Sequence, residues 1–271
     1  MTRRLGLAVA GHAVAGALLA PYLVMLLTAL KPDAELRTSP PRLLPLDWRP
    51  ENFLAVLADP AFHGWLRVSL VVAAVSTALV VLAAVPAAYH TARRRFPGRT
   101  AFLLLVLVTQ MFSPTALVVG LYRQFFALDL VNTYTALILT NAAFNLAFAV
   151  WMLRAFFASI PVELEEAAAV DGCSRAGALV RIVLPLARPG IVTVVVFAFI
   201  AAWNEYVVAL TLMTDPAMKP LTVGITTYVT AYVQHWNLLF AASTLAIVPV
   251  VALFALIEPY LVSGLTAGSL K

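Results

Sequence analysis

The side chains that could do chemistry in this chain are a few amide and carboxyl groups set within long apolar stretches. Glu205 directly follows Asn204, whereas Asn141 and Asn145 are four residues apart, a spacing that places both on one face of a helix. Such groups donate and accept hydrogen bonds and suit a solute rich in hydroxyl groups. The candidates for a polar path through the apolar stretches are Gln110, Asn141, Asn145, Trp203, Asn204 and Glu205.

Each of these candidates also has a purely structural interpretation. A charged side chain at the centre of a bilayer costs about 2.5–3.5 kcal/mol on insertion scales, so Glu205 needs water or a partner group. An interhelical hydrogen bond that only holds a helix bundle together would satisfy it equally well. Trp203 could stack on a ring of a bound solute or pack in the core, and packing is the commoner role for a single tryptophan.

The sequence contains no arrangement typical of an enzyme or a metal site. None of the lysines follows a glycine, which excludes the phosphate-binding pattern G-x-x-x-x-G-K-[ST]. No nucleophile elbow and no pair of carboxylates placed for hydrolysis is present. Cys173 is the single cysteine, and the four histidines have no metal-ligand spacing. We therefore expect no catalytic residue, no metal and no cofactor in this chain.

The composition is that of a membrane protein. Hydrophobic residues make up 62% of the 271 residues and charged residues 11%, and the mean hydropathy is +0.93. Soluble domains have about 45–50% apolar and about 25% charged residues. We expect an all-α polytopic membrane protein that forms a single domain over 1–271. The apolar runs predict six transmembrane helices, at about 5–30, 68–90, 101–121, 135–157, 191–213 and 238–262.

Each apolar run is long enough to cross the bilayer. At about 1.5 Å of rise per residue, every run spans the roughly 30 Å hydrocarbon core. The first run follows Arg3 and Arg4, as in a secretory signal peptide. Its apolar stretch is longer than the roughly 7–15 residues of a signal peptide, and no Ala-x-Ala-like cleavage site follows it. We expect it to be retained as the first span.

The distribution of basic residues predicts the orientation. With the N-terminus inside, the cytoplasmic segments hold eleven of the 18 Lys and Arg residues, which favours both termini in the cytoplasm. The net charge of +5 therefore follows from topology, and no nucleic-acid partner is needed to explain it. The longest outer segment, 31–67, predicts either a short interfacial helix with Trp48 and Trp65 near the headgroups, or a plain connector.

A charged stretch interrupts the apolar chain between the fourth and fifth runs, at about 158–189. Pro161 suits the first turn of a helix because that position needs no backbone donor. Glu163, Glu165 and Glu166 then lie near the positive end of the helix dipole. A first short helix is therefore predicted to begin here.

A second short helix is predicted directly after the first. Asp171 and Gly172 form a pair typical of a turn, in which glycine adopts a positive φ without a clash. Ser174 can then cap a helix that ends at Pro185. Two short helices joined by a tight turn would form a stiff protrusion on the cytoplasmic side.

Seven positions of this stretch follow a fixed spacing. Glu166 precedes two alanines, Gly172 follows after three further residues, and Ile182 follows after nine more. This spacing resembles the EAA loop of ABC importer permeases, whose pattern is E-A-A-x3-G-x9-I-x-L-P. The fixed positions are matched by Glu166, Ala167, Ala168, Gly172, Ile182, Leu184 and Pro185.

The resemblance implies a type I ABC importer permease fold in a bacterial inner membrane. In that family the loop, here the coupling loop at about 158–189, docks into a groove on an ATPase subunit. ATP and Mg would be bound by those subunits, with no cofactor in this chain. The family implies a complex of two homologous permease subunits, two ATPase subunits and an extracytoplasmic substrate-binding protein.

Two further segments resemble the carbohydrate-uptake branch, specifically its six-span, maltose-type second permease. These are the run Trp203-Asn204-Glu205-Tyr206 and the C-terminal run 261–271, of which 264–271 is implied as a second contact with the ATPase subunits. The resemblance implies a sugar or polyol as the substrate. No Lys or Arg lies deep within a predicted span, which also favours a neutral solute.

Two alternatives remain open at the level of the sequence. An ABC importer permease for another solute, such as a glycerol phosphodiester, would share the coupling loop. A secondary transporter or channel that works without ATP would share the six spans but would need no ATPase partner. Which solute is carried, and how much of the specificity this subunit supplies, do not follow from the residues.

Overall fold

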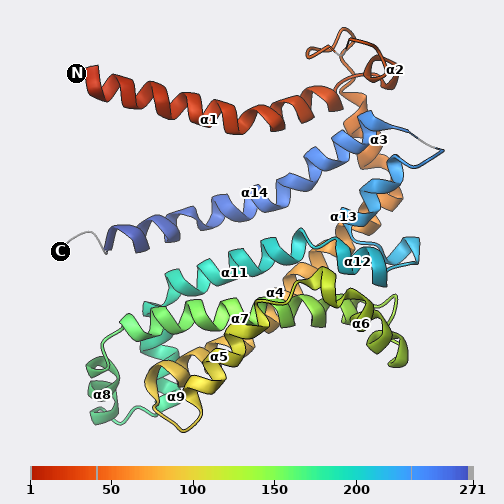
Figure 1. The fold of residues 1–271 in the computed structure, drawn as a ribbon. Helices are drawn as coiled ribbons and strands as arrows, with labels where there is room; N and C mark the ends of the chain where they lie inside the picture. The colour runs from red at the N-terminus through yellow and green to blue at the C-terminus, as the bar shows by residue number, and fades with distance from the viewer. Residues whose placement is uncertain (1, 41, 233, 268–271) are drawn as a thin grey trace.

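The computed structural model describes residues 2–40, 42–232 and 234–267 and is built almost entirely of helices (Figure 1). The all-α prediction is confirmed, because the described residues add only one isolated bridge, between Val229 and Gln234. The long helices are α1 (Thr2–Ala29), α4 (Pro60–Arg93), α7 (Tyr134–Ser159), α11 (Arg188–Trp203) and α14 (Trp236–Ala267).

The number of helices that could cross a membrane is four to six. Four segments are long and apolar enough on their own, and they lie in α1, α4, α7 and α14. Two further spans arise if each of two bent helix pairs counts as one span. The prediction of six spans corresponds to the upper figure.

The predicted span at 101–121 is not one straight helix. It forms α5 (Arg99–Thr109) and α6 (Pro114–Ala127), whose axes are bent by 96°. Pro114 has no backbone N–H to donate to the carbonyl of Gln110, four residues earlier, so the helix ends and restarts. The bend places Gln110 at a break instead of mid-helix.

The predicted span at 191–213 is also interrupted. Helix α11 ends at Trp203, and α12 (Val207–Leu212) begins after three residues. On its other side, α11 is bent by 76° from the helical segment at Arg175–Leu186. The break after Trp203 coincides with the polar residues that the sequence singled out.

The buried core lies where α4, α7 and α11 pack together. Val80 from α4, Leu153 and Phe157 from α7, and Val194 from α11 belong to one buried cluster. Val183, from the coupling loop, belongs to the same cluster. The coupling loop is therefore packed directly onto these helices.

Helix α1 lies apart from the bundle, and α14 lies between α1 and α11 (Figure 1). None of the apolar window of α1 is buried within this chain, and for α14 the buried share is 11%. The two helices meet near their outer ends, where the Asn52 side chain donates to the carbonyls of Ala29 and Lys31. The side-chain oxygen Oδ1 of Asn52 accepts from the side-chain amide of Asn237 at 3.0 Å.

The outer segments contain several short helices. The prediction of a short helix within 31–67 agrees with α3 (Glu51–Ala58), which lies directly before α4. Trp48 is exposed, whereas Trp65 is only 6% exposed and its ring packs inside the protein. The other short outer elements are α2 (Asp33–Leu36), η2 (Pro216–Met218), α13 (Leu221–Gly224) and η3 (Ile225–Tyr228).

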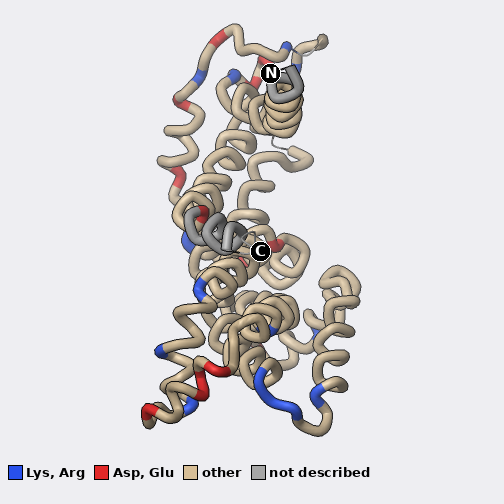
Figure 2. The backbone as a smooth tube through the Cα atoms, turned by 90° about the vertical axis from the view of Figure 1, so that its left-hand side faces the viewer, with Lys and Arg blue, Asp and Glu red and all other residues tan. Residues whose placement is uncertain are grey.

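The opposite end of the bundle carries the coupling loop. Its elements α8 (Glu163–Val170) and α9 (Arg175–Ala178) lie beyond the ends of α4 and α7 (Figure 1). Figure 2 faces this end of the bundle and shows red segments and a continuous blue stretch at its lower edge. Charged residues therefore gather at this end, and a second group of them lies over 31–59, in the loops and short helices before α4.

Candidate functional site: the coupling loop and the polar break

Helix α8 presents a small exposed surface. Its first turn carries Glu163, Glu165 and Glu166, whose negative charges interact favourably with the positive end of the helix dipole. Glu166 and Ala167 are exposed, whereas Ala168 is buried. Within the part of the chain that the structure describes, the Glu166 carboxylate has no hydrogen bond or ion pair. The surface around Glu166 is therefore free to meet another chain.

The turn after α8 is a complete helix-ending motif. Gly172 has φ +82°, a conformation that a side chain would strain. The N–H of Gly172 donates to the carbonyl of Ala169 at 3.1 Å, and the N–H of Cys173 donates to that of Ala168 at 2.9 Å. This pair of bonds satisfies carbonyls that the helix end leaves unpaired. The predicted tight turn is present.

The second helix differs in one respect from the prediction. Ser174 caps it, since its hydroxyl accepts from the N–H of Gly177 at 3.1 Å. However, the helix does not end at Pro185, because a π-helical turn, η1 (Leu179–Val183), leads directly into α10 (Leu184–Leu186). A wider turn moves the carbonyl of Arg181 away from the proline ring, which would clash with it in a regular α-helix.

The remaining positions of the E-A-A pattern anchor this second helix. Leu184 packs against the buried cluster of α4, α7 and α11. Ile182 and Pro185 are half-buried. The fixed residues thus include Glu166 and Ala167, which are exposed on α8, and Ile182, Leu184 and Pro185, which are half-buried within η1 or directly after it.

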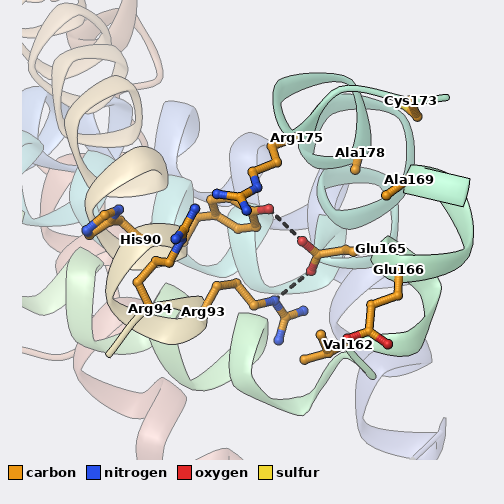
Figure 3. Close-up of a pocket in the computed structure, with 11 residues that line it drawn as sticks. His90, Arg93, Arg94, Val162, Glu165, Glu166, Ala169, Cys173, Arg175 and Ala178 are labelled. Atoms are coloured by element: carbon orange, nitrogen blue, oxygen red, sulfur yellow. Dashed lines mark hydrogen bonds and ion pairs between the residues drawn. The ribbon is translucent and has the colours of Figure 1, made fainter. Parts of the chain in front are cut away.

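Glu165 joins the coupling loop to the helix bundle. Its Oε1 accepts from Arg93 Nε at 2.6 Å, and its Oε2 accepts from the Tyr89 hydroxyl at 2.5 Å. Arg93 also donates from Nη2 to the carbonyl of Ile160 at 3.0 Å. Figure 3 shows Glu165 pointing toward Arg93, whereas Glu166 points away from these contacts.

Sequence reasoning missed this contact. Glu165 was identified only as a favourable residue for the helix dipole, and Arg93 only as part of a positive-inside stretch. A pocket of about 400 Å³ lies beside the contact and is also lined by His90, Arg94 and Arg175. The sequence carries no signal for this contact, because it does not show which of the two adjacent glutamates faces α4. That depends on how α8 packs.

Glu205 occupies the break between α11 and α12. Its carboxylate oxygens accept from the backbone N–H groups of Val208 at 2.7 Å and Ala209 at 2.9 Å. Its own carbonyl accepts from the Thr222 hydroxyl at 2.7 Å. The carboxylate therefore supplies acceptors to the N–H groups that open α12, which is the role of a helix cap. This geometry favours the structural interpretation of Glu205.

The asparagines on α7 bond mainly to their own helix. The side chain of Asn141 donates to the carbonyl of Leu137 at 2.9 Å, and that of Asn145 donates to the carbonyl of Asn141 at 2.8 Å. Asn141 and Glu205 line the same small cavity of about 10 Å³. Gln110 is exposed and donates to the carbonyl of Phe144 at 3.4 Å.

Trp203 and Asn204 line a larger cavity, of about 420 Å³, between α1, α11, α13 and α14. Trp203 is only 4% exposed and stacks on Phe199 with ring centroids 5.8 Å apart, so it is mainly a packing residue. Asn204 is exposed, and Tyr22 lines the same cavity. The structure thus distributes the polar candidates over several places, with Gln110 and Asn145 lining neither of these two cavities.

The coupling-loop spacing, the exposed face of α8 and the helical bundle can be compared with known proteins. Residues 79–266 match the family described as the binding-protein-dependent transport system inner membrane component. The chain belongs to this family. The resemblance recognised in the E-A-A spacing is therefore confirmed.

Curated relatives in this permease family match nearly the whole chain. The sulfoquinovosyl glycerol transport system permease protein SmoH of Agrobacterium fabrum is 40% identical over 251 residues, covering 93% of this chain and 88% of that protein. The trehalose/maltose transport system permease protein MalG of Thermococcus litoralis is 35% identical over 254 residues, covering 93% and 91%.

The fold agrees with that of a solved transporter. A chain in the crystal structure of a bacterial ABC transporter involved in the import of the acidic polysaccharide alginate superposes with a TM-score of 0.81. The two sequences are 23% identical, and the match covers 95% of this chain and 96% of the other. The likeness confirms the fold class.

Membership of the permease family fixes the general role of the chain. It is a multi-pass inner-membrane permease subunit of an ABC importer that depends on a binding protein. It is not itself catalytic, and ATP hydrolysis belongs to a separate subunit. The predicted second contact at 264–271 lies partly outside the described residues, which end at 267.

Proposed function

We propose that this chain forms half of the translocation path of an ATP-driven sugar importer and is driven through its coupling loop. The exposed face of α8 carries this proposal, because Glu166 and Ala167 are presented to solvent on a loop whose other half is packed in the core. A surface that is exposed on one side and anchored in the core on the other can transmit the movement of a bound partner to the helices. The names of the curated relatives, which include sugar and glycoside carriers, support a carbohydrate as the solute.

The partners follow from the incomplete burial of the chain. We infer a second, homologous permease subunit, since the apolar window of α1 remains unburied among the described residues of this chain. Two ATPase subunits would bind the coupling loops of the two permeases, and a substrate-binding protein would meet the outer segments. ATP and Mg would lie in the ATPase subunits.

The proposed topology has both termini in the cytoplasm. Helices α1 and α14 run from their outer ends, near α3, toward the end of the bundle that carries α8 (Figure 1). Arg93, Arg94 and Arg95 lie at that end, which agrees with the preference of basic residues for the cytoplasmic side.

The proposed mechanism is alternating access. Closure of the ATPase dimer would move the coupling loop, and the packed contact of Val183 and Leu184 with the core would carry this movement into α4, α7 and α11. The path would thereby change from inward-open to outward-open, where the binding protein delivers the solute. Only a ligand or partner that favours one state can shift such an equilibrium.

Exchange of Glu166 for lysine tests the coupling role. Because Glu166 is exposed and its carboxylate makes no hydrogen bond or ion pair within the described chain, Glu166→Lys should leave assembly of the permease intact. It should lower sugar uptake and binding-protein-stimulated ATP hydrolysis about tenfold, the scale of a coupling energy between sites. The measurement is uptake in proteoliposomes of the whole complex, with Glu163→Lys as the matched charge control on the same helix. Unchanged uptake would remove Glu166 from the coupling surface.

A second experiment tests the path. Asn204 is exposed at the break and lines the cavity of about 420 Å³. Asn204→Leu replaces an amide by an apolar side chain of similar size, so a hydroxylated solute loses a hydrogen-bond partner, worth about 0.5–1.5 kcal/mol. We expect a three- to tenfold fall in sugar uptake at an unchanged amount of assembled complex. Equal uptake would place the path elsewhere.

Two alternatives are outcomes of these measurements. If the solute belongs to another class, such as a glycerol phosphodiester, that compound would compete for the site on the substrate-binding protein, and a sugar would not. A self-sufficient channel or secondary transporter would carry solute in proteoliposomes that contain this chain alone, without any ATPase subunit.

A further inference from the structure

Helix α4 is held at both ends by polar contacts to segments that are distant in the sequence. At its inner end, Arg93 and Tyr89 contact Glu165 of the coupling loop. At its outer end, Asp59 accepts from the Tyr228 hydroxyl at 2.8 Å. The helix is continuous over 34 residues, about 50 Å at 1.5 Å per residue, so the two contacts lie at opposite ends of the bundle.

The inner contact is shielded from water. The side chains of Arg93 and Glu165 are only 10% and 13% exposed, in contrast to the outer ion pair of Arg37 and Asp33, at 56% and 24%. A shielded ion pair that also has hydrogen-bond partners is lost at a high cost when one member is removed. Here the carboxylate has two donors, and Arg93 has Ile160 as a second acceptor.

This contact matters because α8 packs little apolar surface onto the bundle. Leu164 is 43% exposed, Val162 46% and Val170 88%. Ala168 is the buried residue of this helix. The position of α8 relative to α4 therefore depends strongly on the polar contacts of Glu165.

The outer half of α4 is joined closely to the segment between α12 and α14. Trp65 lies so near Gly224 that a Cβ added to this glycine would meet the indole at 2.1 Å. The Trp65 ring also meets that of Tyr228 edge to face, with centroids 5.8 Å apart. The Ser69 hydroxyl accepts from the N–H of Leu221 at 2.7 Å.

The outer contact persists over the physiological pH range. Burial, together with the hydrogen bond and the negative charge of Asp59, raises the pKa of the Tyr228 hydroxyl above its ordinary value. The hydroxyl therefore remains a proton donor to Asp59 at neutral pH. Since Asp59 also accepts from the N–H of Ala61, it fixes the first turn of α4 to the outer segment.

We propose that Arg93 and Tyr89 are positioning residues that fasten the coupling loop to α4, and that α4 passes movement of this loop to the outer segment at 220–228. This inference rests on the proposed function, in which an ATPase subunit moves the loop. Without the contact, movement of α8 reaches α4 only indirectly, through the packing of Val183 and Leu184 against the buried cluster of α4, α7 and α11. The contact adds a direct connection to the helix that holds the outer segment.

The test is a double-mutant cycle in the reconstituted complex with its binding protein. Arg93→Ala and Glu165→Ala should each lower the stimulation of ATP hydrolysis by the binding protein about tenfold, within the range of about 5–150-fold for coupled sites. Hydrolysis without the binding protein should remain, because neither residue belongs to the ATPase subunit. Stimulation in the double variant should be no lower than in the more impaired single variant, since both changes remove the same contact.

Two further variants separate positioning from general stability. Arg95→Ala removes the same charge from an exposed neighbour and should leave the stimulation unchanged. Arg93→Lys keeps the charge but not the fork that reaches both Glu165 and Ile160, so it should restore part of the stimulation. The amount of assembled complex is measured for every variant.

The outcomes are distinct for the two proposals. Stimulation unchanged in Arg93→Ala, or losses that multiply in the double variant, would overturn the role of the contact while sugar uptake by the wild type still stands. Loss of assembly in Arg93→Ala with no recovery in Arg93→Lys would also overturn it in favour of a purely structural pair. Failure of the wild-type complex to import any sugar would refute the proposed function instead.

Discussion

Glu205→Ala is expected to lower the yield of assembled permease from membranes at least tenfold. The carboxylate accepts from the N–H groups of Val208 and Ala209, and both residues are almost completely buried. An unsatisfied buried donor costs about 1–3 kcal/mol, and two are left by this change. A loss of this size is a large fraction of the 5–15 kcal/mol that stabilises a typical domain.

Glu205→Gln discriminates between a cap and a path residue. Glutamine keeps the shape and one acceptor oxygen, so it should retain more assembled permease than alanine does. Asn204→Ala, at the neighbouring exposed position, should assemble normally. If Glu205→Ala assembles as well as the wild type but imports no sugar, the carboxylate serves the path and the capping role is wrong. The measurements are the yield of folded complex and uptake per assembled complex.

The contrast between Glu205 and the coupling loop explains what the sequence could predict. The coupling loop is recognisable because its spacing reflects local geometry: a helix start, a glycine at positive φ and a serine cap all act within a few residues. The residues that produce these features are neighbours in the sequence. The fold class followed in the same way from the length and apolarity of the runs.

Features that have no distinctive local pattern, or that depend on distant residues, could not be predicted. The apolar run at 191–213 looks continuous, because the signal for its interruption is a single carboxylate whose acceptors face the following N–H groups. Likewise, Glu165 and Glu166 are equivalent in the sequence. Only the packing of α8 beside α4 places Glu165 in contact with Arg93 and leaves Glu166 exposed.

Trp65 illustrates the same limit on the outer side. A tryptophan near the end of a span is often placed at the headgroups, which was the prediction here. The absence of a side chain at Gly224 leaves room for the Trp65 ring inside the protein, and the sequence does not indicate this contact. This pair is separated by more than half of the chain, so no local pattern reports it.

Gly172→Pro should lower sugar uptake and binding-protein-stimulated ATP hydrolysis more than a hundredfold, with membrane insertion intact. Proline fixes φ near −65°, whereas Gly172 has φ +82°. It also removes the N–H that donates to the carbonyl of Ala169. The turn between α8 and α9 would open, and Glu166 would no longer be held in a fixed place relative to the packed half of the loop.

Gly98 supplies a matched control for the backbone strain. It has φ +86°, lies in another loop at the same end of the bundle, and has open space around it, as Gly172 has. An alanine in this conformation costs about 1–2 kcal/mol at either site. Gly172→Ala should therefore reduce stimulated ATP hydrolysis severalfold, whereas Gly98→Ala should leave the ratio of stimulated to basal hydrolysis unchanged. Equal effects of the two alanines would mean that strain alone, and not the geometry of the coupling loop, limits transport.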